Sequence, residues 1–208
     1  MYLPEQFAED RLPVLHAAIR AAGLANLVTT GPDGIAASPL PLMLDPDAGP
    51  YGTLYGHLAR ANPQWRTSDP AVQALAIFMG PDSYITPSYY QTKRETGKVV
   101  PTWNYVTIHA YGPVAFSEDL TELLDVVTRL TRRHEDGRAS PWAVDDAPSG
   151  FVQGQLKGII ALRMPLSRLQ GKWKMSQNRT PADREGVVAG LRADGHAAMA
   201  ALVAEKMD

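Results

Sequence analysis

The sequence predicts an α+β fold in which a mostly antiparallel β-barrel has helices on its outside. Three observations support this fold class. Short runs rich in β-branched and aromatic residues follow one another with tight turns between them. Helical periodicity is confined to the beginning, the middle and the end of the chain. Alternating strand and helix units, which build parallel sheets, are missing from the pattern.

Length and composition indicate one globular domain. The chain has 208 residues, of which 45% are hydrophobic and 20% are charged, so one sizeable core can be buried. We expect a single domain over residues 1–208 with a C-terminal helical extension over about 180–208. The net charge of −2 gives no overall attraction to nucleic acid or to an anionic membrane. The lack of cysteine excludes disulfides, thiolate nucleophiles and cysteine-based metal sites.

The N-terminal segment MYLPEQFAEDR has acidic residues and no long apolar stretch, unlike a signal peptide. The longest apolar run, residues 74–79, is far shorter than the roughly 20 residues that cross a bilayer. We therefore expect a cytoplasmic protein without a membrane segment.

The first part of the chain predicts one helix followed by strands. Residues 9–23 have apolar side chains at helical spacing, and Gly23 is a favourable stop. Residues 24–30 and 35–44 then predict two strands around the turn GPDG. Pro39 and Pro41 place the second of these at an edge, a bulge or a barrel rim. Further strands are expected at residues 51–57 and 71–79, with a continuation at 83–86.

Residues 101–116 predict one long strand with two different faces. The face with Asn104, Val106 and Ile108 is small and aliphatic, whereas the face with Trp103 and Tyr105 is aromatic. Residues 118–137 predict the clearest helix, and residues 158–166 another strand. Two short helices follow Thr180, with a break at Asp194–Gly195. The helix at 118–137 has this expected apolar stripe: Leu120, Leu123, Leu124, Val127 and Leu130.

Several standard sites are excluded by their motifs. The chain has no G-x-S-x-G, no G-x-G-x-x-G and no Walker-type phosphate loop. Its five histidines show no metal-ligand spacing, so we predict no metal site. No side chain stands out as an acid, base or nucleophile, which leaves the catalytic residues unknown and enzymatic activity open.

The stretch YGHLARANPQW, residues 55–65, places His57, Arg60 and Asn62–Pro63 between a predicted strand and a predicted short helix. Asn62 and Pro63 suit the start of that helix. A helix N-terminus beside a cation is an anion site that best matches phosphate. The residues alone leave this interpretation and an ordinary structural loop equally open.

Three further segments each have two interpretations. Residues 87–105 mix aromatic and basic side chains, and they form either the wall of a pocket for a flat ligand or a surface loop. Residues 170–179 are polar and basic, which is unusual near a terminus unless they close over something. The cluster Arg129, Arg132, Arg133 and Arg138 could contact DNA phosphates, although a charged outer helix face is commoner. No helix-turn-helix unit is evident.

Five motifs in this order resemble the PaiB-type FMN-binding negative transcriptional regulators: MYLP..F, GHLARANPQW, YITPSYY, VPTWNY and KMSQNR. The resemblance extends from Met1 to about Arg179. It departs from the family pattern at Thr86 and Tyr89, where serine and tryptophan are expected. The resemblance implies a split β-barrel similar to pyridoxamine 5′-phosphate oxidase, a homodimer, and FMN bound between the subunits.

The resemblance also implies cofactor-binding residues. Backbone contacts to the flavin are expected near Ser38 and Leu40. The phosphate is expected at His57, Ala59 and Arg60, in a loop shaped by Asn62. The segments PTWNY and KMSQN are expected nearer the flavin ring, through Trp103, Asn104, Lys174, Ser176 and Gln177.

The family implies transcriptional repression, but a DNA partner is not evident from the sequence. An FMN-dependent oxidoreductase of the split-barrel type and a flavin-binding module without turnover are the alternatives.

Overall fold

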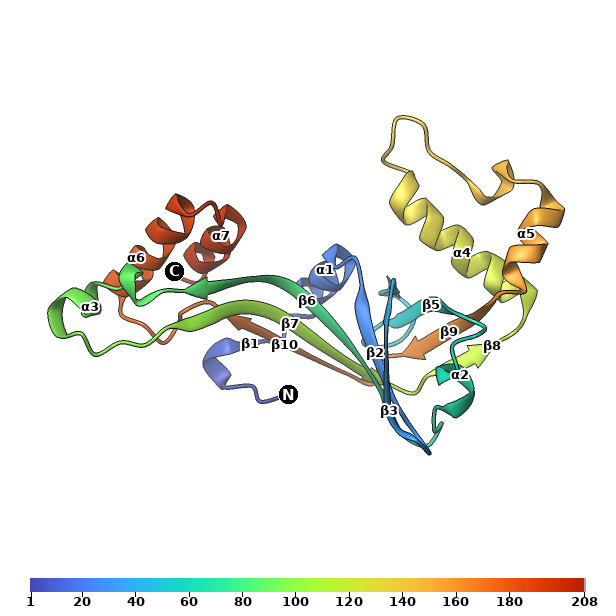
Figure 1. Ribbon diagram of the computed structural model, residues 1–208, viewed down its shortest axis with the longest axis horizontal. Coiled ribbons are helices and arrows are strands. Elements are labelled where there is room, and N and C mark those ends of the chain that lie inside the picture. The colour runs from blue at the N-terminus through green and yellow to red at the C-terminus, as the bar shows by residue number, and fades with distance from the viewer. Residues whose placement is uncertain (208) are drawn as a thin grey trace. The chain divides into compact units, whose positions relative to one another are not determined.

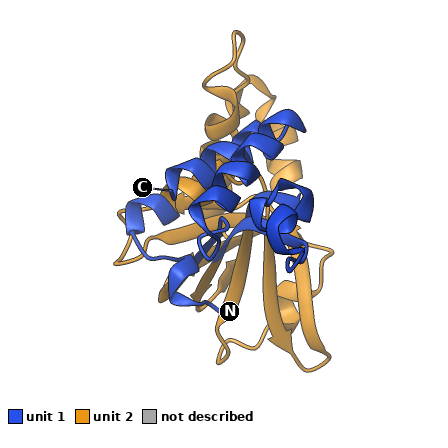
Figure 2. Cartoon of the chain, turned by 90° about the vertical axis from the view of Figure 1, so that its left-hand side faces the viewer, with its two compact units in different colours: residues 1–15, 79–108, 170–208 blue, residues 16–78, 109–169 orange. Residues whose placement is uncertain are grey.

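The computed structural model describes residues 1–207, and the chain divides into two compact units. Unit 1 consists of residues 1–15, 79–108 and the part of the chain from residue 170 on. Unit 2 consists of residues 16–78 and 109–169. Figure 2 shows the two units in different colours. Because each unit is assembled from separate segments, the contacts that build it are long-range.

The strands within residues 1–207 form two sheets (Figure 1). The six-stranded sheet has the order β1-β10-β7-β6-β2-β3, and the four-stranded sheet has the order β4-β5-β9-β8. In the six-stranded sheet, β1 pairs antiparallel with β10, and β2 pairs antiparallel with both β3 and β6. All strand pairs of the four-stranded sheet are antiparallel as well. The strands are β1 (Ala8–Glu9), β2 (Ala25–Gly31), β3 (Gly34–Leu40), β4 (Met43–Asp45), β5 (Thr53–Ala59), β6 (Ala74–Ile85), β7 (Thr102–Gly112), β8 (Ala115–Ser117), β9 (Ile159–Pro165) and β10 (Arg168–Lys174).

The α-helices are α1 (Leu12–Ala21), α2 (Gln64–Thr67), α3 (Gln91–Thr96), α4 (Leu120–Glu135), α5 (Ser149–Leu156), α6 (Pro181–Ala193) and α7 (Ala197–Glu205). Short 3₁₀ turns are η1 (Glu5–Phe7), η2 (Pro87–Tyr89) and η3 (Val144–Asp146). No helix in the described chain is long and apolar enough to cross a membrane. The predicted α+β class with mostly antiparallel strands is confirmed.

Two predicted strands are each split in the structure. The expected strand at 35–44 ends at Leu40 as β3, and β4 begins at Met43 in the other sheet. The expected strand at 101–116 likewise divides into β7 and β8 around Gly112–Pro113. Proline cannot donate a ladder hydrogen bond, so Pro41 and Pro113 fall at the breaks. Strand β10 and helices α3 and α5 were not predicted, because their segments lack a clear apolar period.

The core of unit 2 lies against one face of the four-stranded sheet. Leu54 and Leu58 of β5 and Ile160 and Leu162 of β9 are almost completely buried. Alternation along β9 directs Ala161 to the opposite face, where it packs with Leu123 of α4 and Leu156 of α5. Helices therefore cover that second face.

Helix α4 differs from its predicted apolar stripe. Leu123 and Leu130 are buried as expected, together with Val126, which was not predicted. Leu120 and Leu124 are instead 44% and 42% exposed. The helix starts at Asp119, whose carboxylate accepts hydrogen bonds from the N–H groups of Thr121 and Glu122. The contact face is thus rotated toward Val126, and it is narrower than the apolar pattern suggested.

Arg133 of α4 stabilises the end of another helix in unit 2. Its guanidinium donates to the carbonyl oxygens of Arg20 and Ala22 at the end of α1, and to that of Leu42 at 3.0 Å. Burial lowers the pKa of Arg133, and the nearby Arg20 adds to this effect. A cation at a helix C-terminus satisfies carbonyl groups that have no helical partner.

We expect Arg133→Ala to lower the free energy of unfolding by about 2 kcal/mol, because a charged donor to several carbonyl groups is lost. Urea denaturation measures this loss. Arg132→Ala is the matched control, since Arg132 has no side-chain hydrogen bond or ion pair within residues 1–207. Equal stability of the two variants would contradict the capping role.

In unit 1 the C-terminal helices hold the segment that contains η2 and α3. The buried carboxylate of Asp183 accepts hydrogen bonds from the Thr92 N–H at 2.9 Å and the Thr92 hydroxyl at 2.8 Å. The Tyr89 hydroxyl donates to Asp194, and burial raises the pKa of Tyr89 to about 12. Residues in the first turn of α6 and directly after its last turn therefore both hold this segment.

The N-terminus and the C-terminus of unit 1 are joined through Glu9. This carboxylate is 4% exposed and forms ion pairs with Arg11 at 2.5 Å and with Lys206 at 3.1 Å. Hydrogen bonding from Arg11 lowers the pKa of Glu9 from 4.5 to about 2, against the opposing effect of burial.

Because the folded-state pKa is the lower one, Glu9 stabilises the fold above about pH 4.5, and this contribution is lost as the pH falls toward 2. We expect Glu9→Gln to cost about 2 kcal/mol at pH 7, after allowance for solvent screening around the exposed Arg11. Urea denaturation at pH 7 and pH 3 should show the difference between wild type and variant shrinking at the lower pH. Glu185→Gln, an exposed change in α6, is the control. A difference that does not depend on pH would contradict the ion-pair explanation.

Candidate functional site

The predicted site residues fall into two clusters, one within each unit. Ser38, Leu40, His57, Ala59, Arg60 and Asn62 belong to unit 2. Trp103, Asn104, Lys174, Ser176 and Gln177 belong to unit 1. Each cluster is described within its own unit.

The unit 2 cluster is built around a buried glutamine, Gln64. The Ser38 hydroxyl donates to Gln64 Oε1 at 2.6 Å, and Asn62 Nδ2 donates to Ser38 Oγ at 2.8 Å. Asn62 Oδ1 in turn accepts from the Gln64 N–H at 3.0 Å. The Gln64 amide group also donates to the Leu27 carbonyl and the Thr29 hydroxyl. Asn62 thus shapes the loop after β5, and Ser38 fastens that loop to β3.

Arg60 is already bound by groups of its own unit. Its guanidinium forms an ion pair with Glu118 and donates to the Lys157 carbonyl at 2.6 Å. An anion at Arg60 would therefore have to compete with a carboxylate. The neighbouring helix α2 has only four residues, which leaves little helix dipole.

His57 has a buried nitrogen, Nδ1, without a hydrogen-bond partner among residues 1–207. Burial lowers the pKa of this histidine, which favours the neutral ring. The side chain of Leu40 is buried at 8% exposure, and Ala59 is exposed at the end of β5. Any contact of Leu40 with a ligand would come from its backbone, because β3 lies at the end of the sheet order.

In unit 1, Lys174 belongs to a group of three cations that have no carboxylate partner in the described part of the chain. Lys172 and Lys174 have side chains on the same face of β10, and Arg179 follows in the next loop. None of the three forms an ion pair within residues 1–207. Lys174 Nζ donates to the Thr102 hydroxyl and to the Trp103 carbonyl at 2.5 Å. Burial lowers the pKa of Lys174, and the charges of Lys172 and Arg179 add to this effect.

Aromatic rings surround these cations. The ammonium group of Lys172 lies 5.4 Å from the ring centre of Tyr2 and 5.5 Å from that of Tyr105. The Arg179 guanidinium lies 4.6 Å from the ring centre of Tyr90. Trp103 of β7 stays 52% exposed in an edge-to-face pair with Tyr84. The cations are therefore held partly by ring faces rather than by acids.

Ser176 has a backbone conformation that is rare for a residue with a side chain, with φ of 61°. Its buried hydroxyl lies 3.0 Å from Asn104 Nδ2 and 3.2 Å from Asn104 Oδ1. Gln177 accepts from the Met175 N–H and donates to the Trp173 carbonyl, each at 2.6 Å. Backbone strain persists where surrounding contacts enforce it, and it is frequent at functional sites. Asn104, Ser176 and Gln177 together fix the loop between Lys174 and Arg179.

These features suit an anionic, aromatic ligand such as a flavin nucleotide. Three neighbouring positive charges repel one another and gain from an anion. The Tyr90 hydroxyl is a second signal, because it is buried, forms no well-aligned hydrogen bond within residues 1–207 and has the Arg179 cation as its neighbour. Exposed rings such as those of Trp103 and Tyr84 offer surfaces on which a flat ring system can stack. The residues of unit 1 therefore fit FMN better than Arg60 does.

Sequence reasoning missed Lys172, Arg179, Gln64 and Glu118. The motifs QGKWKMSQNR and GHLARANPQW contain the first three, but nothing in them separates a free cation from a paired one. Glu118 lies 58 residues from Arg60, and only the fold brings them together.

The arginine cluster considered for DNA contact is largely occupied. Arg129 pairs with Asp125 and Asp45, each at 3.3 Å, and Arg138 pairs with Glu135. Arg133 holds the end of α1. Only Arg132 of the four is without a side-chain partner in residues 1–207. The charges of this cluster are thus largely neutralised or used within unit 2, and its contact with DNA stays a prediction.

Solved structures with the same fold include flavoproteins. A FAD- and haem-binding protein from Mycobacterium smegmatis aligns with a TM-score of 0.58 at 15% identity, over 82% of this chain and 74% of that one. A flavocytochrome from Azotobacter vinelandii aligns with a TM-score of 0.58 at 11% identity, over 84% of this chain and 70% of that one. The fold is therefore the split β-barrel of the flavin-binding class, as predicted.

A sequence model of the family described as "Putative FMN-binding domain" matches residues 1–168. An uncharacterised protein from Emericella nidulans is 35% identical, over 92% of this chain and 90% of the relative. The "Protease synthase and sporulation protein PAI 2" of Bacillus subtilis is 31% identical, over 92% of this chain and 89% of the relative. The chain belongs to this FMN-binding-domain family, and the predicted PaiB-type resemblance is confirmed. Lys172, Lys174 and Arg179 lie beyond the matched residues.

Proposed function

We propose that the protein binds FMN as a homodimer and acts as a PaiB-like negative regulator of transcription. The observation that supports flavin binding most strongly is the group of three cations on β10 and its following loop, which have no carboxylate partner within residues 1–207. Lys174 and Arg179 supply positive charge for the anionic part of the cofactor. Trp103 and Tyr84 supply exposed aromatic surface, and the Asn104–Ser176 pair keeps the loop in position.

FMN supplies reversible one- or two-electron chemistry when bound, and it could equally report a redox state to a regulator. The name of the Bacillus subtilis relative refers to protease synthesis and sporulation, which supports a regulatory role over an oxidoreductase. The contact with DNA or with a protein partner is expected outside the arginines of α4, since most of these are already engaged.

Exposed apolar side chains of unit 1 support the homodimer. Met79, Tyr84, Val100 and Trp103 are each between 49% and 65% exposed. Apolar surface of this kind favours a partner over water. We propose that a second copy covers it.

Purification and a visible spectrum test this proposal first. We expect a yellow protein whose released cofactor has the mass of FMN, and a dimer by light scattering. Recovery of FAD, or of no flavin even after incubation with FMN, would argue against the proposed ligand. A monomer with full FMN occupancy would contradict the dimer. Slow or absent reduction by NADH and NADPH is expected of a regulator, whereas rapid reduction would favour the oxidoreductase alternative.

A further inference from the structure

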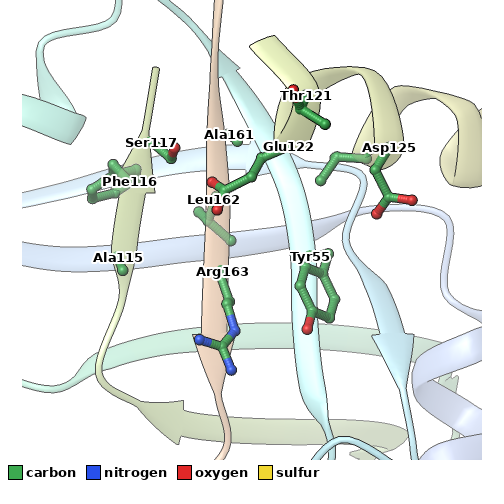
Figure 3. Close-up of a pocket in the computed structure, with 11 residues that line it drawn as sticks. Tyr55, Ala115, Phe116, Ser117, Thr121, Glu122, Asp125, Ala161, Leu162 and Arg163 are labelled. Carbon is green, nitrogen blue, oxygen red and sulfur yellow. The ribbon is translucent and has the colours of Figure 1, made fainter. Parts of the chain in front are cut away.

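Unit 2 contains a cavity of about 590 Å³ between α4 and strands β5, β8 and β9 (Figure 3). Its volume is within the range of small-molecule sites. The lining includes apolar groups from three elements, among them Ala115 of β8, Ala161 of β9 and Val126 of α4. None of the predicted flavin-binding residues lines it. The cavity therefore needs an explanation of its own.

Some of the polar groups around the cavity are already engaged. Asp119 binds the first free N–H groups of α4, so the start of this helix offers no anion site. Asp125 pairs with Arg129, which also lies 4.8 Å from the ring centre of Tyr55. These charges balance one another at one wall of the cavity.

Among the charged groups of the lining, Glu122 and Arg163 are the exceptions. Both line the cavity, and neither has a side-chain hydrogen bond or ion pair within residues 1–207. They also do not pair with each other, so their charged atoms are farther apart than the 4.0 Å limit of an ion pair. Figure 3 shows the Arg163 guanidinium directed away from the Glu122 carboxylate. One cavity thus presents a free anion, a free cation and an apolar surface.

We propose that this cavity binds a zwitterionic small molecule with an apolar middle, of the size of a dipeptide. The ligand's carboxylate would bind Arg163, and its ammonium group would bind Glu122. Its apolar side chains would lie against Val126 and the ring of Tyr55. A dipeptide is compatible with two charges that lie farther apart than an ion pair, because two extended residues span roughly 7 Å. Arg163 suits the carboxylate because its planar fork matches two oxygens.

The probe that tests this site is the dipeptide leucyl-phenylalanine, together with its N-acetyl and C-amide forms. Ligand-detected NMR titration and calorimetry measure the three affinities with the wild-type protein. We expect the free dipeptide to bind at least about tenfold more tightly than either blocked form, because each blocked form loses one charge-assisted contact.

Variants separate the two ends of the ligand. With Arg163→Gln, the dipeptide and its C-amide should bind alike, and with Glu122→Gln the dipeptide and its N-acetyl form should bind alike. Arg20→Gln and Asp33→Asn change exposed residues of unit 2 outside the cavity lining, and they should keep wild-type affinities. The proposal is overturned if the dipeptide does not bind at millimolar concentration. It is equally overturned if the blocked forms bind as tightly as the free one.

Discussion

Gly186→Ala is expected to destabilise the protein, although the same change usually stabilises a helix. Alanine in place of glycine normally contributes about 0.5–1 kcal/mol in a helix interior. At Gly186 of α6, however, an added Cβ atom would lie 2.0 Å from the carbonyl oxygen of Tyr89. That oxygen belongs to the backbone, so no side-chain rotation can relieve the clash. Helix α6 or the segment before α3 must move.

The movement would disturb the hydrogen bonds of Asp183 with Thr92 and of Tyr89 with Asp194. We therefore expect a net loss of about 3 kcal/mol in the free energy of unfolding, as for other overpacked sites with broken hydrogen bonds. Thermal and urea denaturation measure it.

Gly154→Ala is the matched control for this change. Gly154 is also inside a helix, α5, but nothing lies within 4 Å of the position of its added Cβ. This variant should be more stable than wild type by about 0.5–1 kcal/mol. If Gly186→Ala raised stability in the same way, the close approach of α6 to Tyr89 would be wrong.

The sequence pattern alone was sufficient to predict elements whose boundaries are set by their own residues. Helix α1 has apolar side chains at helical spacing and a glycine after its end, and it forms where expected. The β2–β3 hairpin has its turn at Pro32 and Asp33, and the φ of 100° at the following Gly34 favours glycine. By contrast, nothing in the sequence around Gly186 and Gly190 explains why helix α6 contains two glycines. Their purpose becomes visible only with Tyr89, about 100 residues earlier in the chain, packed against them.

Prediction of the candidate site was likewise limited by contacts between residues that are far apart in the sequence. The family resemblance implied that Asn62 shapes a loop and that Lys174 and Ser176 lie near the flavin. Whether a cation is free for a ligand depends on charges that approach from elsewhere in the fold. Arg60 has Glu118 as a partner, whereas Lys174 has only hydroxyl and carbonyl groups. Charge pairing of this kind has no signature in a single sequence, so the roles of Arg60 and Lys174 could not be ranked without the structure.

Neutralising Lys174 and Arg179 together is expected to weaken FMN binding by about two to four orders of magnitude. Each substitution to glutamine removes one charge-assisted contact of about 1.5–3 kcal/mol, or roughly ten- to a hundredfold in affinity. Fluorescence quenching of FMN during titration measures the dissociation constant. Lys174→Arg keeps the charge and should retain most of the affinity. Arg192→Gln, an exposed change in α6, should have no effect.

Arg60→Gln distinguishes the two clusters as sites of the cofactor's phosphate. Because Glu118 already neutralises Arg60, we expect this variant to lose much less affinity than the double variant. Glu118→Gln sharpens the comparison, since it frees Arg60 and should strengthen binding only if the phosphate lies there. A larger loss with Arg60→Gln than with the double variant, in proteins of equal melting temperature, would assign the phosphate to the loop after β5. The cations of β10 would then have to serve another part of the flavin or another anion.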